Sequence, residues 1–223
     1  FGVMNNAGFT VVTGEIGSGK TTLVRCLLRR IEPNVKVGLI SNTPRGREEL
    51  LQWVMLSLDQ PFEGNFPTLF KRLRDHLFQQ YNSGRRTIVI VDEAQNLDWE
   101  SLEDLRMLSN INADKHQVLQ LILVGQPQLR DLLRSPELTQ FAQRVSSDFH
   151  LRPLQLNDVE NYINHRLQAA GAKNALFTRE ACELIAKASH GIPRTINILC
   201  DTALVYGFAT NVPYVDAHAE NTA

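Results

Sequence analysis

The 223 residues suffice for one large domain or two small ones, because domains usually contain about 100 to 200 residues. Lysine and arginine total 23 and aspartate and glutamate total 24, so the net charge of −1 gives no overall field that would attract nucleic acid or an anionic membrane. A chain of this length can bury a sizeable core. No apolar stretch reaches the roughly 18 residues of a membrane-spanning helix, so we expect a soluble, cytoplasmic piece.

The cysteines indicate the cellular compartment of the protein. Cys26, Cys182 and Cys200 are odd in number and far apart, and each lies in an apolar helical context. We therefore expect reduced core thiols of a cytosolic protein rather than a disulfide framework. No signal peptide opens the chain. The sequence begins with Phe1, not Met, which is compatible with a piece of a longer product.

The first two thirds of the chain alternate short aliphatic runs with longer amphipathic stretches. The aliphatic runs predict strands at 9–14, 35–41, 86–93, 118–125 and 146–154. The amphipathic stretches predict helices near 20–30, 46–58, 66–82 and 98–112. Because strands that alternate with helices usually form a parallel sheet, we expect an α/β fold whose sheet is covered on both faces.

The pattern changes after Leu154. No further strand signal follows, and helices are predicted at about 157–170, 178–189 and 194–208. In the last of these, apolar residues recur at the spacing of one buried helix face. We therefore expect a core of residues 1–154 and a small helical domain of residues 155–223.

The segment GEIGSGKT, residues 14–21, matches the phosphate-binding loop G-x-x-x-x-G-K-[ST] between a predicted strand and a predicted helix. Backbone N–H groups and the helix start would surround phosphate oxygens, Lys20 would neutralise them, and the Thr21 hydroxyl would bind Mg²⁺. The alternative is a glycine-rich turn that binds nothing. The residues expected to contact nucleotide are Gly14, Glu15, Gly17, Ser18, Gly19, Lys20, Thr21 and Thr22.

The segment TIVIVDEAQNL, residues 87–97, is an apolar strand that ends in two acids. The ends of parallel strands meet the phosphate loop, so Asp92 would hold Mg²⁺ through water and Glu93 would polarise the water that attacks the γ-phosphate. The alternative is a pair of acids that caps the next helix. Together with the loop, the adjacent glutamate predicts nucleotide hydrolysis.

Polar residues also follow two other predicted strands. Asn42 follows VGLIS and Gln126 follows LQLILVG, so both would point into the crevice of Asp92 and Glu93. Asn42 would hold Glu93 away from the water until a partner binds, and Gln126 would sense the γ-phosphate or orient the water. The alternative is that both are loop residues that cap the next element.

An arginine precedes the last predicted strand. Arg144 would reach the γ-phosphate of a neighbouring subunit as an arginine finger, and Arg130 and Arg134 are the next candidates for that role. The alternative for Arg144 is a surface ion pair with Glu137 or Asp148, which would contribute little.

Five segments in this order resemble an AAA+ ATPase: GEIGSGKTT, VDEAQNL, LILVGQPQLRDLL, FAQRV and GIPRTINILC. More narrowly, they resemble the general secretion pathway protein A group (ExeA-like) and the similar ATPases beside exosortase and exopolysaccharide loci. The resemblance extends from Gly8 to about Gly207.

The resemblance implies a P-loop fold with a five-stranded parallel sheet of order 5-1-4-3-2, a helical lid, and assembly into rings or arcs. It implies ATP and Mg²⁺ as cofactors and repeats the roles given above to Lys20, Thr21, Asp92 and Glu93. It makes Gln126 the first sensor, Arg144 the finger and Arg194 the second sensor. Asn42 matches the position of the glutamate switch.

Arg194 stands in the first turn of a predicted helix, where a cation opposes the macrodipole at a cost of about 0.3–1 kcal/mol. The second-sensor role would explain it, because contact with the γ-phosphate would make the lid respond to the bound nucleotide. The alternative is a surface ion pair with Asp201.

The sequence departs from the family in two ways. Members usually have more residues before the phosphate loop, including some near the adenine. Relatives that act in secretion continue into a membrane span and a periplasmic peptidoglycan-binding region, and neither is present in this sequence. Base recognition and membrane attachment are therefore not assigned.

Three functions remain open. The first is a homo-oligomeric ATPase that drives assembly or regulation of an envelope secretion or exopolysaccharide export apparatus through a protein partner. The second is a nucleic-acid-binding ATPase of the transposition-target-selection or helicase-loader type, for which the basic clusters at 25–30, 71–74 and 85–86 are weak support. The third is a nucleotide-gated scaffold, against which the Asp92 and Glu93 pair argues.

Overall fold

The computed structural model describes residues 8–41, 47–113, 116–210, 212 and 214–216. Contacts between residues divide the chain into two compact units. One consists of Phe1–Gly14 and Lys20–Leu151, and the other of Glu15–Gly19 and Arg152–Ala223. The boundary expected between residues 154 and 155 stays a prediction. Among the described residues, no helix combines the length and the apolar character needed to cross a membrane.

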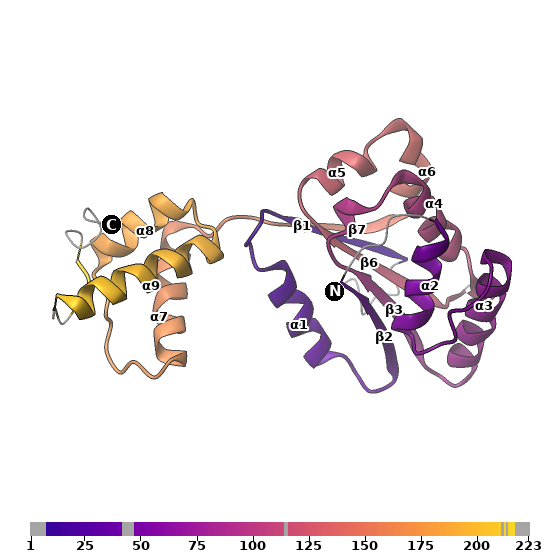
Figure 1. Cartoon of the computed structure of the whole chain (residues 1–223), viewed down its shortest axis with the longest axis horizontal. Coiled ribbons are helices and arrows are strands. Elements are labelled where there is room, and N and C mark those ends of the chain that lie inside the picture. The colour runs from indigo at the N-terminus through magenta and orange to yellow at the C-terminus, as the bar shows by residue number, and fades with distance from the viewer. Residues whose placement is uncertain (1–7, 42–46, 114–115, 211, 213, 217–223) are drawn as a thin grey trace. The chain divides into compact units, whose positions relative to one another are not determined.

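The larger unit contains a parallel sheet (Figure 1). Its strands are β1 (Phe9–Gly14), β2 (Val35–Ile40), β3 (Arg86–Val91), β6 (Leu119–Gly125) and β7 (Val145–Leu151). They pair in parallel in the order β2-β3-β6-β1-β7. When only these strands are counted along the chain, the order is 5-1-4-3-2 read from the β7 edge. The fold class is therefore confirmed.

Between β3 and β6 along the chain, four residues form a second, two-stranded antiparallel sheet. It consists of β4 (Asn112–Ala113) and β5 (His116–Gln117). This sheet was not predicted from the sequence, because two residues per strand are too few to show a period of two.

The helices of the larger unit cover both faces of the sheet. They are α1 (Lys20–Arg30), α2 (Arg47–Ser57), α3 (Phe66–Asn82), α4 (Trp99–Leu108), α5 (Gln128–Leu133) and α6 (Thr139–Ala142), with short 3₁₀ helices η1 (Ala94–Asn96) and η2 (Pro136–Leu138). Successive residues of a strand face opposite sides. Val89 and Val91 thus join the core under α2 to α6, whereas Ile88 and Ile90 pack with Val24 of α1. Figure 1 shows α1 on one side of the sheet and α2, α3 and α4 on the other.

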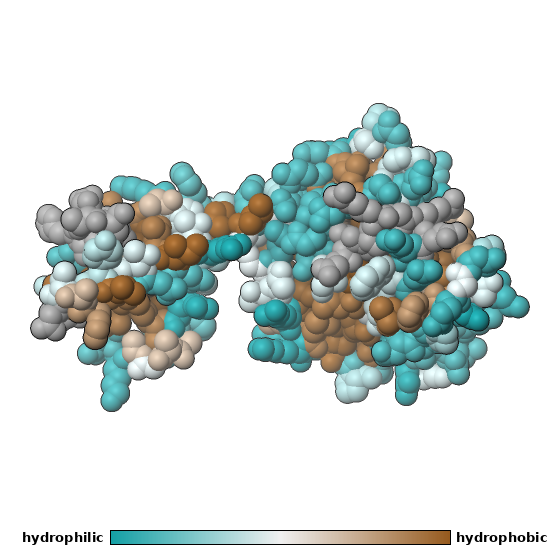
Figure 2. Space-filling model, in the orientation of Figure 1, coloured by the Kyte–Doolittle hydropathy of each residue, from teal (hydrophilic) through white to brown (hydrophobic). Residues whose placement is uncertain are grey.

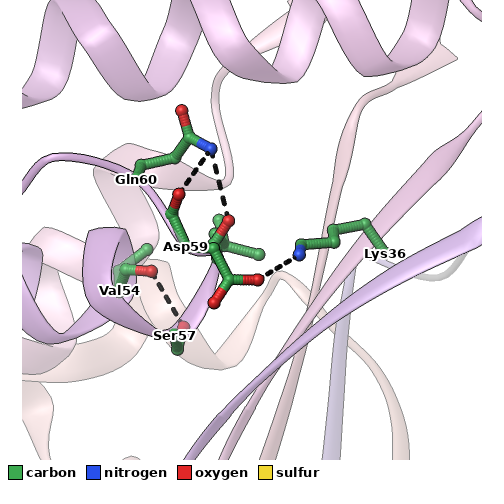
Figure 3. A network of polar contacts seen from close by, with 6 residues as sticks. Lys36, Val54, Ser57, Asp59 and Gln60 are labelled. Atoms are coloured by element: carbon green, nitrogen blue, oxygen red, sulfur yellow. Dashed lines mark hydrogen bonds and ion pairs between the residues drawn. The ribbon is translucent and has the colours of Figure 1, made fainter.

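A polar network fixes the end of α2 to β2 (Figure 3). Asp59, just after the helix, has a left-handed φ of 58°, and its carboxylate accepts a hydrogen bond of 2.5 Å from Nζ of Lys36. This bond and the lysine's charge lower the pKa of Asp59. Gln60 donates to the carbonyls of Leu58 and Asp59, and the Ser57 hydroxyl donates to the carbonyl of Val54. These hydrogen bonds hold the turn that follows α2, and the Lys36–Asp59 ion pair connects this turn to β2.

The smaller unit contains three of the predicted helices: α7 (Leu156–Ala169), α8 (Arg179–Ser189) and α9 (Pro193–Ala209). Their apolar faces form a separate core around Val159, Ile185 and Ile196. Figure 2 shows further apolar residues on the surface of this unit. On α9, Val205 and Phe208 are 68% and 90% exposed.

Cys26 corrects one expectation. The three cysteines are free, and Cys182 is buried, but Cys26 is exposed. Val24 of the same helix is buried in the core, and residues two positions apart on a helix do not share a face.

Candidate functional site

The loop that joins β1 to α1 turns through two glycines with left-handed φ, Gly17 at 80° and Gly19 at 97°. Within it, the Ser18 N–H donates to the carbonyl of Glu15 at 3.1 Å. The Ser18 hydroxyl is buried and has no hydrogen-bond partner among the described atoms. A buried hydroxyl without a partner is costly, and a phosphate oxygen would satisfy it. This part of the loop therefore fits an anionic ligand.

Lys20 begins α1 and is buried, with 7% of its surface exposed. Its Nζ donates to the carbonyl oxygen of Gly14 at 2.8 Å, so the side chain folds back to the start of the loop. Thr21 and Thr22, the next residues of α1, are exposed. The sequence thus places a positive charge and two hydroxyls in the first turn of a helix that follows a buried strand.

Asp92 directly follows β3 and is 7% exposed. Its Oδ2 accepts from the Thr21 hydroxyl at 3.3 Å, and its Oδ1 accepts from the Glu93 N–H at 2.9 Å. The structure therefore brings together the two residues expected at the metal. A hydroxyl and a carboxylate oxygen fit Mg²⁺, which is usually held by one or two carboxylates, water and the substrate's phosphates. Among the described residues, no group of three or more His, Cys, Asp or Glu could hold a metal by itself.

Glu93 adopts a left-handed backbone conformation with φ of 53°. Such a conformation is strained in a residue other than glycine, and strain of this kind concentrates at functional sites. Its Oε2 accepts a hydrogen bond of 2.6 Å from Nε2 of Gln95, in the short helix η1. The backbone and this contact together fix the direction of the carboxylate that we expect to activate water.

Gln126 directly follows β6, and its backbone N–H donates to Oε1 of Gln95 at 2.9 Å. Val91 and Leu123 are partners in the register of β3 and β6, so Asp92 and Gln126 leave the sheet at the same edge. Gln95 thus connects Glu93 to Gln126. The sequence analysis gave Gln95 no role, although it stands two residues after Glu93 in the same motif.

The other expected site residues are not part of this cluster as the structure describes it. Asn42 lies outside the described residues, so its role stays a prediction. Arg144 is exposed in the turn before β7, and its Nη1 makes a long contact of 3.5 Å with Oγ of Ser109. Arg130 forms an ion pair with Asp148, with Nη2 at 2.7 Å, and Arg134 is exposed at the end of α5. Asp148, one of the two acids considered as a partner of Arg144, is therefore bound to Arg130.

Arg194 is the second residue of α9 and is exposed. In the unit that contains both residues, its backbone N–H donates to the carbonyl of Gly17 at 3.2 Å. A Cβ added at Gly17 would lie 2.6 Å from the Cβ of Arg194, so only glycine permits this approach. No ion pair between Arg194 and Asp201 occurs among the described residues.

Known proteins share sequence with this chain. A family model described as an AAA domain matches residues 3–133. General secretion pathway protein A of Aeromonas hydrophila is 40% identical over 211 residues, which cover 94% of this chain and 39% of that protein. The chain therefore spans well under half of this relative. The expected resemblance to the general secretion pathway protein A group is confirmed.

Solved structures share the fold at low sequence identity. The ORC2 protein of Aeropyrum pernix in its ADP form is 18% identical with a TM-score of 0.69, and the match covers 99% of this chain and 64% of that one. The Cdc6p protein of Pyrobaculum aerophilum is 17% identical with a TM-score of 0.69 and coverages of 93% and 57%. The RuvB Holliday junction branch migration motor of Thermotoga maritima is 17% identical with a TM-score of 0.64 and coverages of 96% and 60%.

Proposed function

The chain belongs to the AAA domain family, and from this premise we propose that it binds MgATP and hydrolyses it to ADP and phosphate. The observation that carries the proposal is the contact of Thr21 with Asp92, whose second oxygen receives the N–H of Glu93. The Thr21 hydroxyl and the Asp92 carboxylate are suited to Mg²⁺, and the carboxylate of the adjacent Glu93 is suited to activating water.

Each residue of the site has a separate task in this proposal. Lys20 exchanges the Gly14 carbonyl for oxygens of the β- and γ-phosphates, and its ammonium neutralises charge that develops during transfer. Thr21 and Asp92 hold the Mg²⁺ of the substrate, the latter through water. Glu93 accepts a proton from the water that attacks the γ-phosphorus as the bond to ADP breaks. Gln126 orients that water or senses the γ-phosphate.

We further propose that hydrolysis drives assembly or regulation of a bacterial envelope secretion or exopolysaccharide export apparatus. The support is the identity of 40% with general secretion pathway protein A. In cells that carry the gene, deletion should block secretion or export, and Glu93→Gln should not restore it. Full restoration by Glu93→Gln would contradict a role for hydrolysis.

The nucleic-acid alternative gains no specific support from the described residues. Nη1 of Arg72 donates to the carbonyl of Glu63 at 2.8 Å, and Arg74 pairs with the neighbouring Asp75. Two cations of the expected basic cluster at 71–74 thus have partners within the chain. The solved structures named above, at 18% identity or less, show the fold alone.

The test of the proposed reaction is steady-state hydrolysis of ATP with Mg²⁺ and with excess EDTA. Glu93→Gln should lower kcat on the order of 100-fold or more, because it removes the general base and keeps the size of the side chain. EDTA should abolish hydrolysis. The matched control is Glu100→Gln, an exposed acid in the first turn of α4, which should leave kcat unchanged. Absence of hydrolysis by the wild type at every protein concentration would overturn the proposal.

A further inference from the structure

Gln95 uses both ends of its amide at the candidate site. Its Nε2 donates to Oε2 of Glu93 at 2.6 Å, and its Oε1 accepts from the backbone N–H of Gln126 at 2.9 Å. An ionised carboxylate only accepts hydrogen bonds and a backbone N–H only donates them. These two partners therefore fix the orientation of the amide, because a flipped amide would oppose oxygen to oxygen and N–H to N–H.

The backbone around Gln95 is shaped for this arrangement. Glu93 has the left-handed φ of 53°, which starts the short helix that carries Gln95. Gly125 ends β6, and a Cβ at this position would lie 2.8 Å from Oε1 and 3.3 Å from the backbone N of Gln95. A larger residue at position 125 would push Gln95 away from Gln126. Gly125 thus leaves room for the amide of Gln95 at the end of β6.

We propose that Gln95 is a positioning residue that holds the Glu93 carboxylate and couples its direction to the backbone of Gln126. This inference rests on the proposed function, in which Glu93 activates water and Gln126 senses the γ-phosphate. A shift of the Gln126 N–H moves Oε1 of Gln95, which accepts from it, and Nε2 of the same amide then moves the Glu93 carboxylate. Gln95 therefore connects Gln126, at the end of β6, directly to Glu93, the proposed general base.

Two substitutions separate this role from simple packing. Gln95→Met keeps most of the side-chain length and volume but removes both hydrogen bonds. Gln95→Glu keeps an acceptor for the Gln126 N–H but places a second carboxylate against Glu93, and two carboxylates this close share a proton. The matched control is Gln79→Met, at an exposed position of α3. Thermal melting identifies any variant that does not fold.

The measurements are kcat, KM and the pH dependence of ATP hydrolysis by the 223-residue chain. Gln95→Met should lower kcat on the order of 10- to 100-fold, because a misplaced catalytic group has an effect of this size, while KM stays within about twofold. Gln95→Glu should move the acidic limb of the kcat profile to higher pH by about one unit or more. Gln79→Met should match the wild type in all three quantities.

The outcomes distinguish the inference from the proposed function. If the wild type hydrolyses ATP and Glu93→Gln does not, but folded Gln95→Met retains full kcat, the positioning role is overturned and the proposed function stands. An unmoved acidic limb in folded Gln95→Glu would also overturn the positioning role. Absence of hydrolysis by the wild type would overturn both.

Discussion

At the scale of single residues, Gly191 shows how one position orders the smaller unit. Its φ is 70°, and a Cβ added there would lie 2.2 Å from the carbonyl oxygen of Leu154. The Leu154 N–H donates to the Gly191 carbonyl at 2.9 Å, so the two backbones are in direct contact. The glycine before α9 thus ties the start of that helix to the segment that precedes α7.

Gly191→Ala should lower the free energy of unfolding of this unit by more than about 2 kcal/mol, because it combines backbone strain with a steric clash. Urea denaturation followed by circular dichroism measures the change. Gly171→Ala is the matched control, because Gly171 has φ of 97° and nothing within 4 Å of an added Cβ. That control should lose only the strain cost of about 1–2 kcal/mol. Equal losses in the two variants would contradict the close contact with Leu154.

At the scale of elements, α3 carries a buried histidine. His76 is 9% exposed, and its Nε2 has no hydrogen-bond partner among the described atoms. Burial, and to a lesser degree the charge of Lys36, lowers the pKa of His76 below its ordinary value of 6.5. The folded state therefore favours the neutral imidazole, whereas the unfolded chain takes up a proton more readily.

Because the pKa of His76 is lowered in the folded state, we expect the free energy of unfolding to fall in acid. The stability that neutral His76 contributes to the folded state is fully present above pH 6.5. It is lost as the pH falls toward the lower pKa that His76 has in the folded state. His76→Gln should flatten the fall in unfolding free energy between about pH 7.5 and 5.5. Urea denaturation at several pH values measures it, and the exposed His165→Gln serves as control. Parallel pH curves for the wild type and His76→Gln would refute this explanation.

The strands and long helices could be predicted from the sequence because their patterns are strong. The strands β3 and β6 are aliphatic runs that the structure buries almost completely, and α3 begins and ends at the predicted residues. The two-residue strands β4 and β5 escaped prediction, because runs this short cannot show a period of two. The role of Gln95 also escaped, because it depends on the approach of η1 to the end of β6. No local pattern encodes that approach.

At the scale of the whole molecule, the surroundings of Arg144 bear on the proposed assembly of several subunits. Arg144 is exposed, its long contact with Ser109 is to a hydroxyl, and it forms no ion pair with any described residue. Arg130, by contrast, is held by Asp148 of its own chain. Arg144 is therefore better placed than Arg130 to reach a neighbouring subunit in the assembly that we propose.

If Arg144 acts in a neighbouring active site, the specific activity should rise with protein concentration. Arg144→Ala should abolish this rise and leave the affinity for ATP nearly unchanged, because the finger stabilises the transition state rather than the bound substrate. Arg134→Ala, at the exposed end of α5, is the comparison variant and should keep the rise. A specific activity that does not depend on concentration would exclude a finger supplied by another subunit.

We propose that Glu93 activates the water that cleaves ATP held by Lys20, Thr21 and Asp92. A test of this role is to identify the nucleotide that Glu93→Gln retains after incubation with MgATP and removal of unbound nucleotide. The variant should retain ATP, whereas the wild type should retain ADP or nothing. Retention of ADP by Glu93→Gln, at the rate at which the wild type forms it, would contradict the assignment of Glu93 as the base.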